Sequence, residues 1–316
     1  MDRLRSRARL LARLREFFDR HDFLEVETPL LSADTVVDRH LDPLSVTLFD
    51  EPQVPSVGRE MWLQTSPEFA MKRLLAAGAE RIYQITRAFR GAETGAHHNP
   101  EFTIVEWYRA GDSMDSGMSL LSELAEEFLN ADCVIRTSYQ EAFQRHIGLN
   151  PHTATVRELE AVAIGQGIPI PDEMPTDDCD EWLNLLLATL VEPKLGGTAP
   201  EILYDYPASQ AALARVRDST PPVAERFELY VNGLELANGY HELLDADVLR
   251  ERNRKTNLLR QTDGKYALPE HSRLLEAMDH GLPNCVGVAL GFDRLVMVAT
   301  GASNLQEVMA FPIDRA

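Results

Sequence analysis

The 316-residue chain has little cysteine and no long apolar run. Cys133, Cys179 and Cys285 are odd in number and far apart, with neither zinc spacing nor a disulfide framework, which is typical of a reduced cytosolic protein. No run approaches the roughly 20 apolar residues that a membrane span requires. The charged opening segment also lacks the apolar core of a signal peptide. We therefore expect a cytoplasmic protein without a membrane partner.

The chain also lacks the glycine-rich motifs that bind nucleotides. It contains no Walker A sequence, no GxGxxG opening a βαβ unit and no HExxH, and Gly196-Gly197 is typical of a plain turn. A nucleotide site would therefore depend on side chains presented by a sheet. Arginines would matter most, because their bidentate fork suits phosphate.

Positive charge is scarce as well. Asp and Glu outnumber Lys and Arg by 50 to 31, for a net charge of −19. A protein that grips nucleic acid through its backbone usually carries a basic patch, and basic residues here cluster near the N-terminus. We interpret those arginines as the solvated face of an amphipathic helix, and we expect no tRNA partner.

Hydrophobic patterning predicts one α+β domain over residues 1–316, with helices inserted between strand blocks at about 112–200. The turn at Ser66-Pro67 separates a strand from a helix that Gly78 closes, with Ser66 as its N-cap and Pro67 as its first residue. The other expected elements are an amphipathic helix over 1–18, a hairpin over 81–111, strands over 201–207 and 226–243, a polar helix over 246–262, and a strand followed by a helix over 286–301.

Several charged residues lie in strand-like, apolar stretches. In HHNPEFTIVEWY, strand alternation places Phe102, Ile104, Glu106 and Tyr108 on one face, where a carboxylate is costly unless it meets a cation. Taken singly, each such residue also fits a surface carboxylate or a structural ion pair. Together with two arginines they favour a site for a polyanion, a metal ion and an ammonium group.

Three motifs occur in order: FLEVETPLL, FRGAETGAHHNPEFTIVEWY and GVALGFDRLVM, with SPEFAMKRLL and RFELYVNGLELANGYHEL between them. In these the chain resembles the catalytic core of class II aminoacyl-tRNA synthetases, the lysyl branch in particular, over nearly its entire length. The resemblance implies an antiparallel sheet flanked by helices, and a homodimer joined through the first motif.

Within that branch, the chain is most similar to the lysyl-tRNA synthetase paralogues that modify elongation factor P. Only about one helix precedes FLEVETPLL, where the synthetases carry an anticodon-binding barrel, and Ala289 stands where they have glycine. The segments LQTSPEF and PASQAAL also resemble those paralogues. The resemblance implies ATP-dependent activation of lysine or (R)-β-lysine as an aminoacyl-adenylate, and transfer to a lysine side chain of elongation factor P.

The resemblance also implies roles for individual residues. Those implied to be catalytic are Arg90, Arg294 and Glu235. Those implied to bind Mg²⁺ are Glu228 and Glu235. Those implied to bind ATP are Arg90, Gly91, Ala92, Asn99, Phe102, Glu235, Leu236, Gly291 and Arg294. Those implied to bind the amino acid are Ser66, Pro67, Glu68, Glu106, Tyr108, Asn238, Glu242 and Ala289.

The chain departs from the family at one position. The second motif commonly reads Arg-x-Glu, whereas this chain reads Arg90-Gly91-Ala92, with glutamate only at position 93. Either Glu93 takes over the contact with adenine through a shifted loop, or that contact is lost.

Other functions are compatible with the same core. They are a truncated lysyl-tRNA synthetase that charges tRNA, a ligase of the asparagine-synthetase-like kind that acts on a small amine, and a non-catalytic regulatory paralogue. The retained Arg90, Arg294, Glu235 and Glu242 favour an enzyme. The sequence leaves open which lysine isomer is used and which lysine is the acceptor.

Overall fold

The computed structural model describes residues 1–51, 53–54 and 57–316, and it divides into two compact units. The first unit comprises Met1–Ser113 and Glu242–Ala316, and the second comprises Met114–His241. The single domain expected from the sequence stays a prediction. Within the described ranges, no helix combines the length and apolar character needed to cross a membrane.

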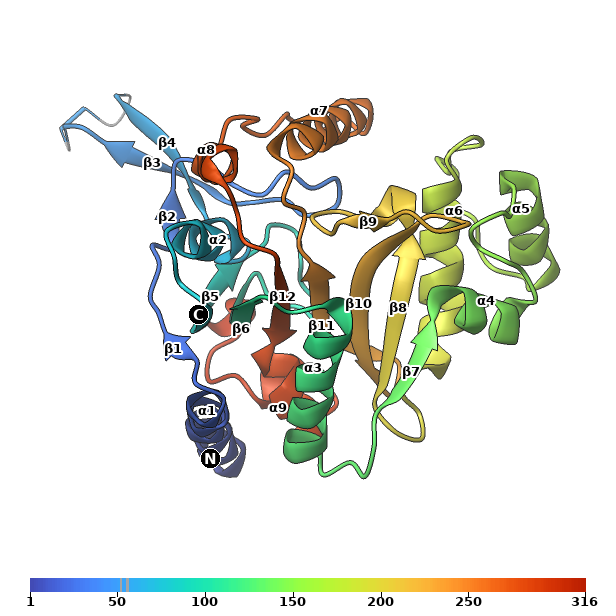
Figure 1. Ribbon diagram of the computed structural model, residues 1–316, viewed down its shortest axis with the longest axis horizontal. Helices are drawn as coiled ribbons and strands as arrows, with labels where there is room; N and C mark the ends of the chain where they lie inside the picture. Colours follow the sequence, from blue (N-terminus) through green and yellow to red (C-terminus); the bar gives the residue numbers. More distant parts are fainter. Residues whose placement is uncertain (52, 55–56) are drawn as a thin grey trace. The chain divides into compact units, whose positions relative to one another are not determined.

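The main sheet of the first unit runs in the order β1 (Leu24–Glu25), β5 (Arg81–Phe89), β6 (Glu101–Ala110), β12 (Cys285–Gly291). β1 is parallel to β5, whereas β5, β6 and β12 are antiparallel neighbours. A second sheet has the order β2 (Leu31–Ser32), β4 (Gly58–Leu63), β3 (Ser45–Phe49). In Figure 1, β3 and β4 project away from the rest of this unit.

The helices of the first unit are α1 (Asp2–Arg20), α2 (Glu68–Ala76), α7 (Ala246–Thr262), α8 (Arg273–His280) and α9 (Phe292–Thr300), with short 3-10 turns at Leu305–Glu307 and Ile313–Arg315. α1 is amphipathic and buries Leu10, Leu14, Phe17 and Phe18. The Phe18 ring stacks on Tyr83 of β5, with 4.4 Å between ring centroids, and lies 5.3 Å from the Trp107 ring of β6. α1 therefore packs against one face of the β5–β6 hairpin.

The period-2 alternation of β6 separates an apolar face from a functional one. Because Trp107 packs toward α1, Glu106 and Tyr108 point to the opposite face. On β12, Ala289 pairs with Glu106 and Gly287 pairs with Tyr108, so these small residues share the functional face. The strand β12 alternates small residues on this face with Val286, Val288 and Leu290 in the core.

The sheet of the second unit has the order β11 (Leu234–His241), β10 (Val223–Val231), β8 (Glu201–Pro207), β7 (Ile135–Ser138), with β9 (Val216–Arg217) also paired to β10. The helical elements are α3 (Met114–Leu129), α4 (Tyr139–Ile147), α5 (Val156–Gly165), α6 (Cys179–Leu186), a π-helix (Leu187–Val191) and 3-10 turns at Glu192–Lys194 and Ala208–Gln210. Capping boxes start α4 at Ser138 and α5 at Thr155. A core that includes Phe143, Trp182 and Leu203 joins the helices to the sheet.

Most of the expected elements are confirmed. The predicted polar helix coincides with α7, the hairpin over 81–111 with β5 and β6, and the first helix with α1. Helix α2 begins one residue later than predicted: Pro67 is its N-cap, and the Ser66 hydroxyl accepts a hydrogen bond from the Glu68 N–H at 3.0 Å. The serine thus forms a local turn instead of a cap. Helix α8 was not predicted, because its eight residues give only two turns of periodicity.

Candidate active site

Three buried glutamates of the first unit surround a buried lysine. Glu68 lies on α2, Glu106 on β6 and Glu242 four residues before the start of α7, and we call these three the carboxylate cluster. Their exposed fractions are 8%, 1% and 1%, and that of Lys72 is 2%. The Lys72 Nζ lies 2.5 Å from Glu68 Oε1 and 2.5 Å from Glu242 Oε2. Charges this deeply buried need partners of opposite charge. Lys72 is the cationic partner of Glu68 and of Glu242.

Glu106 is held by neutral groups. The Tyr108 hydroxyl donates to its Oε1 at 2.6 Å and the Ser66 hydroxyl donates to its Oε2 at 2.8 Å. Burial and the neighbouring charge of Glu68 raise the pKa of Glu106 to about 8, although both hydrogen bonds and Lys72 act in the opposite direction. Glu106 therefore lacks a direct ionic partner among the described residues, and an ammonium ligand would supply one.

Lys72 and Glu242 shift each other's ionisation. Burial raises the pKa of Glu242, and the charge on Lys72 opposes that shift. Burial alone would lower the pKa of Lys72, but the charges of Glu242 and Glu68 outweigh it and raise this pKa above its usual value. Lys72 is therefore a permanent cation of the cluster.

The floor beside the cluster is backbone and small side chains. A Cβ atom at position 287 would overlap both the Tyr108 ring and the Glu242 carboxylate, so only glycine allows them to lie against β12 here. Ala289, the partner of Glu106, is only partly buried. Its methyl group can therefore shape the space above Glu106, as its predicted role requires.

Arg90 follows β5 and faces an aromatic ring. Its guanidinium carbon lies 4.9 Å from the centre of the Phe102 ring. Its Nε is buried without a hydrogen-bond partner among the described residues, and Glu93 Oε1 approaches Nη1 only to 3.9 Å. An incompletely paired guanidinium beside an aromatic face suits a nucleotide, since it offers donors for phosphate and a ring for a base.

The other predicted nucleotide residues of the first unit lie in loops, at strand ends and on α9. Arg294, on α9, donates from Nε to the His97 carbonyl at 3.3 Å, and its Nη2 lies 2.7 Å from His98 Nε2. Burial and the charge of Arg294 lower the pKa of His98. The Asn99 side chain joins two backbone segments, donating to the Glu101 carbonyl and accepting from the Ile313 N–H.

Gly91 and Ala92 continue the chain after Arg90, and Gly291 ends β12. The Gly91 N–H donates to the Asp42 carbonyl at 2.6 Å. Ala92 adopts a left-handed conformation with φ of 60°, which an alanine adopts at some cost. This conformation places Glu93 near Arg90, and whether Glu93 contacts adenine stays a prediction.

The metal residues expected from the sequence lie in the second unit. Glu228, on β10, accepts hydrogen bonds from the hydroxyls of Tyr206 at 2.5 Å and Tyr230 at 2.6 Å, and it pairs with Arg226 at 2.5 Å. Glu235 lies opposite Tyr230 on the neighbouring strand β11. Among the described residues, no three His, Cys, Asp or Glu side chains form a metal-binding group. Mg²⁺ commonly takes one or two carboxylates plus phosphate and water, so a pair is compatible with it.

Leu236 and Asn238 complete the predicted set. Leu236 is buried on β11, and Asn238 donates to the Tyr240 hydroxyl at 3.3 Å. The Oδ1 of Asn238 is buried and has no partner among the described residues, as expected of a group that a ligand completes.

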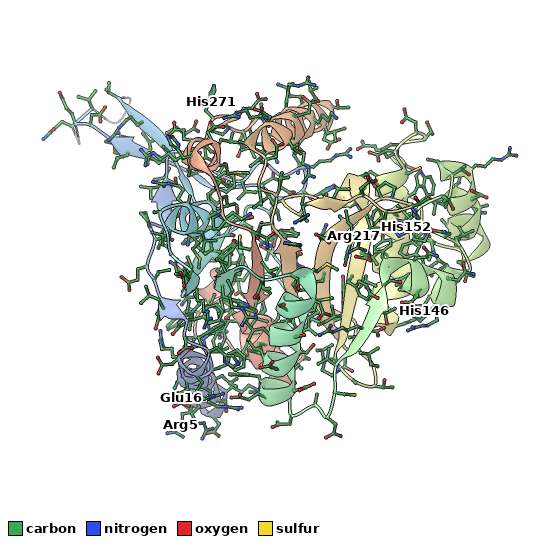
Figure 2. All side chains as sticks on the ribbon, in the orientation of Figure 1. Arg5, Glu16, His146, His152, Arg217 and His271 are labelled. Carbon is green, nitrogen blue, oxygen red and sulfur yellow. The ribbon has the colours of Figure 1, made fainter. Side chains whose placement is uncertain are left out.

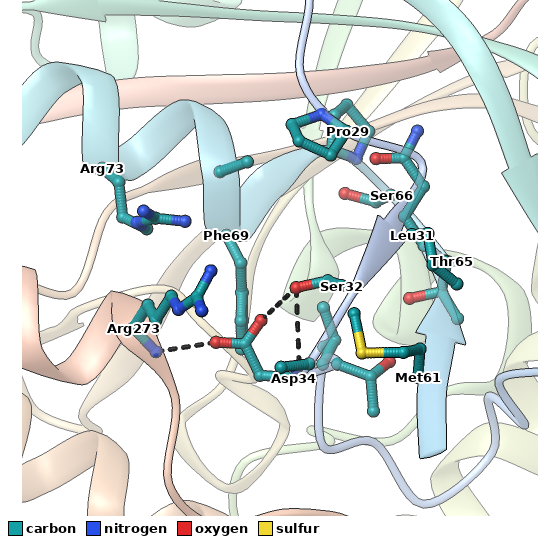
Figure 3. A pocket seen from close by; sticks show the side chains of 16 residues that line it. Pro29, Leu31, Ser32, Asp34, Met61, Thr65, Ser66, Phe69, Arg73 and Arg273 are labelled. Carbon is teal, nitrogen blue, oxygen red and sulfur yellow. Dashed lines mark hydrogen bonds between the residues drawn. The ribbon is translucent and has the colours of Figure 1, made fainter. Parts of the chain in front are cut away.

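A pocket of the first unit lies along the loop that supplies Ser66 to Glu106. Its lining includes Pro29, Asp34, Ser66, Pro67 and Arg273. Figure 3 shows Asp34 accepting hydrogen bonds from the Ser32 hydroxyl and the Arg273 backbone N–H. The carboxylate cluster is not part of this lining, so we place the chemistry at the cluster and treat the pocket wall as support for the Ser66-Pro67 loop.

The arginines of α1 bind acidic residues of the protein itself. Arg7 pairs with Asp293, which also accepts the Thr103 N–H, and Arg15 pairs with Glu25. Arg5 extends from the outer surface of α1 (Figure 2). The N-terminal basic cluster is thus partly used in structural pairs.

The fold and these charged groups define the catalytic core of a class II synthetase. The family model described as tRNA synthetases class II (D, K and N) matches residues 1–315, and the chain belongs to this family. The fold class predicted from the sequence is confirmed.

Particular relatives are similar over nearly their full length. Proteins named elongation factor P–(R)-β-lysine ligase are 46% identical in Pseudoalteromonas translucida, 45% in Yersinia enterocolitica and 45% in Vibrio cholerae. The matches cover 99%, 99% and 100% of this chain and 96%, 95% and 97% of those proteins. The resemblance inferred from the three motifs is confirmed.

Sequence reasoning missed Lys72 and Gly287. Glu68 and Lys72 have the i,i+4 spacing of an ordinary helix pair, and the spacing alone does not reveal that the pair is buried. The signal for Gly287 was the alternation of small and large residues in CVGVALG, which indicates a strand with one open face.

Proposed function

We propose that the chain uses ATP to activate lysine or (R)-β-lysine as an aminoacyl-adenylate and transfers it to a lysine side chain of elongation factor P. The observation that carries this proposal is the carboxylate cluster, in which Lys72 pairs with Glu68 and Glu242 and, among the described residues, leaves Glu106 without a direct ionic partner. A ligand with ammonium groups would complete its charge. The names of the similar proteins support the same substrate and acceptor.

The reaction requires no side-chain nucleophile. A carboxylate oxygen of the amino acid attacks the α-phosphorus of ATP, and the bond to pyrophosphate breaks in line. Arg90 and Arg294 would stabilise the negative charge that develops on the phosphates, and Phe102 would stack on the adenine. Ser66, Tyr108 and Glu242 would hold the amino acid through its amines.

Mg²⁺ would neutralise phosphate charge, held by Glu235 and Glu228. Glu228 would have to exchange one of its present partners for the ion, since both its oxygens accept hydrogen bonds. In the second step, the acceptor lysine attacks the acyl carbon as a neutral amine, and AMP leaves. We also propose a homodimer and a cytoplasmic location.

ATP–pyrophosphate exchange against a panel of amino acids tests the first step. We expect exchange with lysine isomers, and exchange with neutral amino acids alone would contradict the proposal. Mass spectrometry of elongation factor P, with tRNA as the competing acceptor, tests the second step. Label on tRNA instead of elongation factor P would favour a small tRNA-charging enzyme, and no exchange at all would favour a regulatory paralogue.

A further inference from the structure

Lys72 lies where a substrate amine would be expected. Lys72 is one helical turn after Glu68 on α2 and is almost completely buried. It bridges Glu68 to Glu242, which lies 170 residues after Lys72 in the chain. A buried ammonium is costly, so a lysine that served only to stabilise α2 would normally be at the surface. Its position connects the helix to the cluster.

The charges of the cluster do not balance. Glu68, Glu106 and Glu242 can carry three negative charges, and Lys72 contributes one positive charge. Among the described residues, Glu106 receives only the hydroxyl hydrogen bonds of Tyr108 and Ser66. When all three glutamates are ionised, two of their negative charges are therefore not neutralised by a cation among the described residues, and a ligand could neutralise them.

We propose that Lys72 is a positioning residue that sets this charge: by holding Glu68 and Glu242 together, it leaves the site two positive charges short, which selects an amino acid with two ammonium groups. This inference depends on the proposed function, because it assumes that the amino acid binds at the cluster. It adds to that function a residue that does not touch the reacting atoms and yet determines which substrates fit.

Ionisation agrees with this charge count. Burial raises the pKa of Glu106 and of Glu242, so without a ligand these groups hold protons that an incoming ammonium displaces. The other groups that face the cluster stay neutral, since burial and nearby carboxylates raise the pKa of Tyr108 on β6 and of Cys285 on β12. Asp112 contributes to the shift of Cys285.

The pH profile of kcat/KM for lysine in ATP–pyrophosphate exchange tests the role of Lys72. A nearby charge shifts a pKa by about one to three units, so Lys72→Met should move the break in the profile to higher pH by at least about one unit. KM should rise about tenfold or more at pH 7, with a smaller change in kcat. Lys72→Arg keeps the charge and should retain the wild-type break.

Lys255→Met is the matched control. It also removes an i,i+4 pair with a glutamate, Glu251, but on the exposed face of α7. We expect the wild-type profile from it. If the break in the pH profile of kcat/KM is the same in Lys72→Met as in the wild type, the proposal is overturned and Lys72 is a structural residue. The proposed function would stand.

Wild-type protein provides a second test if Lys72→Met does not fold. Titration calorimetry in two buffers of different ionisation enthalpy counts the protons released when lysine or norleucine binds. Lysine should release about one proton more than norleucine near pH 7, because it brings a second ammonium group. Equal release would overturn the charge-matching role. Absence of exchange with every lysine isomer would instead overturn the proposed function and this inference with it.

Discussion

Buried carboxylates are paired very differently in the two units. In the second unit, Glu228 receives two tyrosine hydroxyls and an arginine, so its charge is compensated within the protein. In the first unit, Glu106 receives two hydroxyls and lies among further carboxylates. Because an unpaired buried charge destabilises a fold, its retention is typical of a binding site, whereas a compensated charge is typical of structure.

The same contrast applies to arginine. Arg226 pairs with Glu228 at 2.5 Å and lies over the Tyr206 ring, whereas Arg90 lies over Phe102 and is 3.9 Å from the Glu93 carboxylate. The Nε of each arginine has no hydrogen-bond partner among the described residues. Substitutions at compensated residues should therefore lower stability. Substitutions at uncompensated ones should lower activity and leave stability unchanged or improved.

The largest effect should come from Arg90→Ala. Removing one preorganised group that stabilises transition-state charge costs about 10²- to 10³-fold in rate, so ATP–pyrophosphate exchange should fall by that factor. The melting temperature should hardly change. Arg87→Ala, three residues earlier on β5 and paired with Glu101 at the surface, is the control and should exchange normally. Near-normal exchange by Arg90→Ala would refute its role.

Glu106→Gln should affect binding and stability in opposite directions. Loss of a charged hydrogen bond of about 2–3 kcal/mol should raise KM for lysine about 30- to 150-fold. The pKa of Glu106 is raised from 4.5, its ordinary value, to about 8 when folded, so its contribution to stability is complete below about pH 4 and is lost as pH rises to 8.

Measuring the free energy of unfolding of the ligand-free protein from pH 5 to 8 tests whether Glu106 lowers stability as the pH rises. Wild type should lose stability relative to Glu106→Gln across this range, and the variant should be the more stable protein at pH 8. Glu101→Gln, an exposed position on the same strand, should follow the wild type. A variant that loses stability at pH 8 would mean that Glu106 is a structural group.

Glu228→Gln should lower the stability of the protein, the opposite of the effect expected from Glu106→Gln at pH 8. Removing one partner of a buried pair leaves Arg226 uncompensated and should lower the free energy of unfolding by about 3 kcal/mol. Denaturant unfolding without nucleotide or metal measures this role separately from any metal binding. Tyr206→Phe should cost about 1 kcal/mol, the value of one hydrogen bond. Unchanged stability in Glu228→Gln would remove the contrast between the units.

The smallest effect should come from Ala289→Gly. Removing the methyl group opposite Glu106 enlarges the floor of the site and should change the relative exchange rates of lysine isomers several-fold, since one methyl group is worth about 1–3 kcal/mol in a pocket. Exchange with (S)-lysine and with both enantiomers of β-lysine measures this. Unchanged ratios would place Ala289 outside the site.

Much of the fold could be predicted from local patterns. The limits of α7 and the β5–β6 hairpin follow from periodicity and turn residues, which act within a few positions. Ser66 was misplaced by one residue because a serine before proline can form either a turn or a cap, and only the backbone geometry distinguishes them. Helix α8 was too short for its periodicity to be recognised.

The sequence by itself determined that Glu106 and Tyr108 share a face, because alternation along a strand is a local property of the backbone. It also determined the family, through motifs that keep their order. Only the tertiary structure decided that Lys72 meets Glu242 and that Gly287 makes room for the Glu242 carboxylate. Those contacts join segments far apart in the chain, and their free energies depend on burial, which the local sequence does not determine.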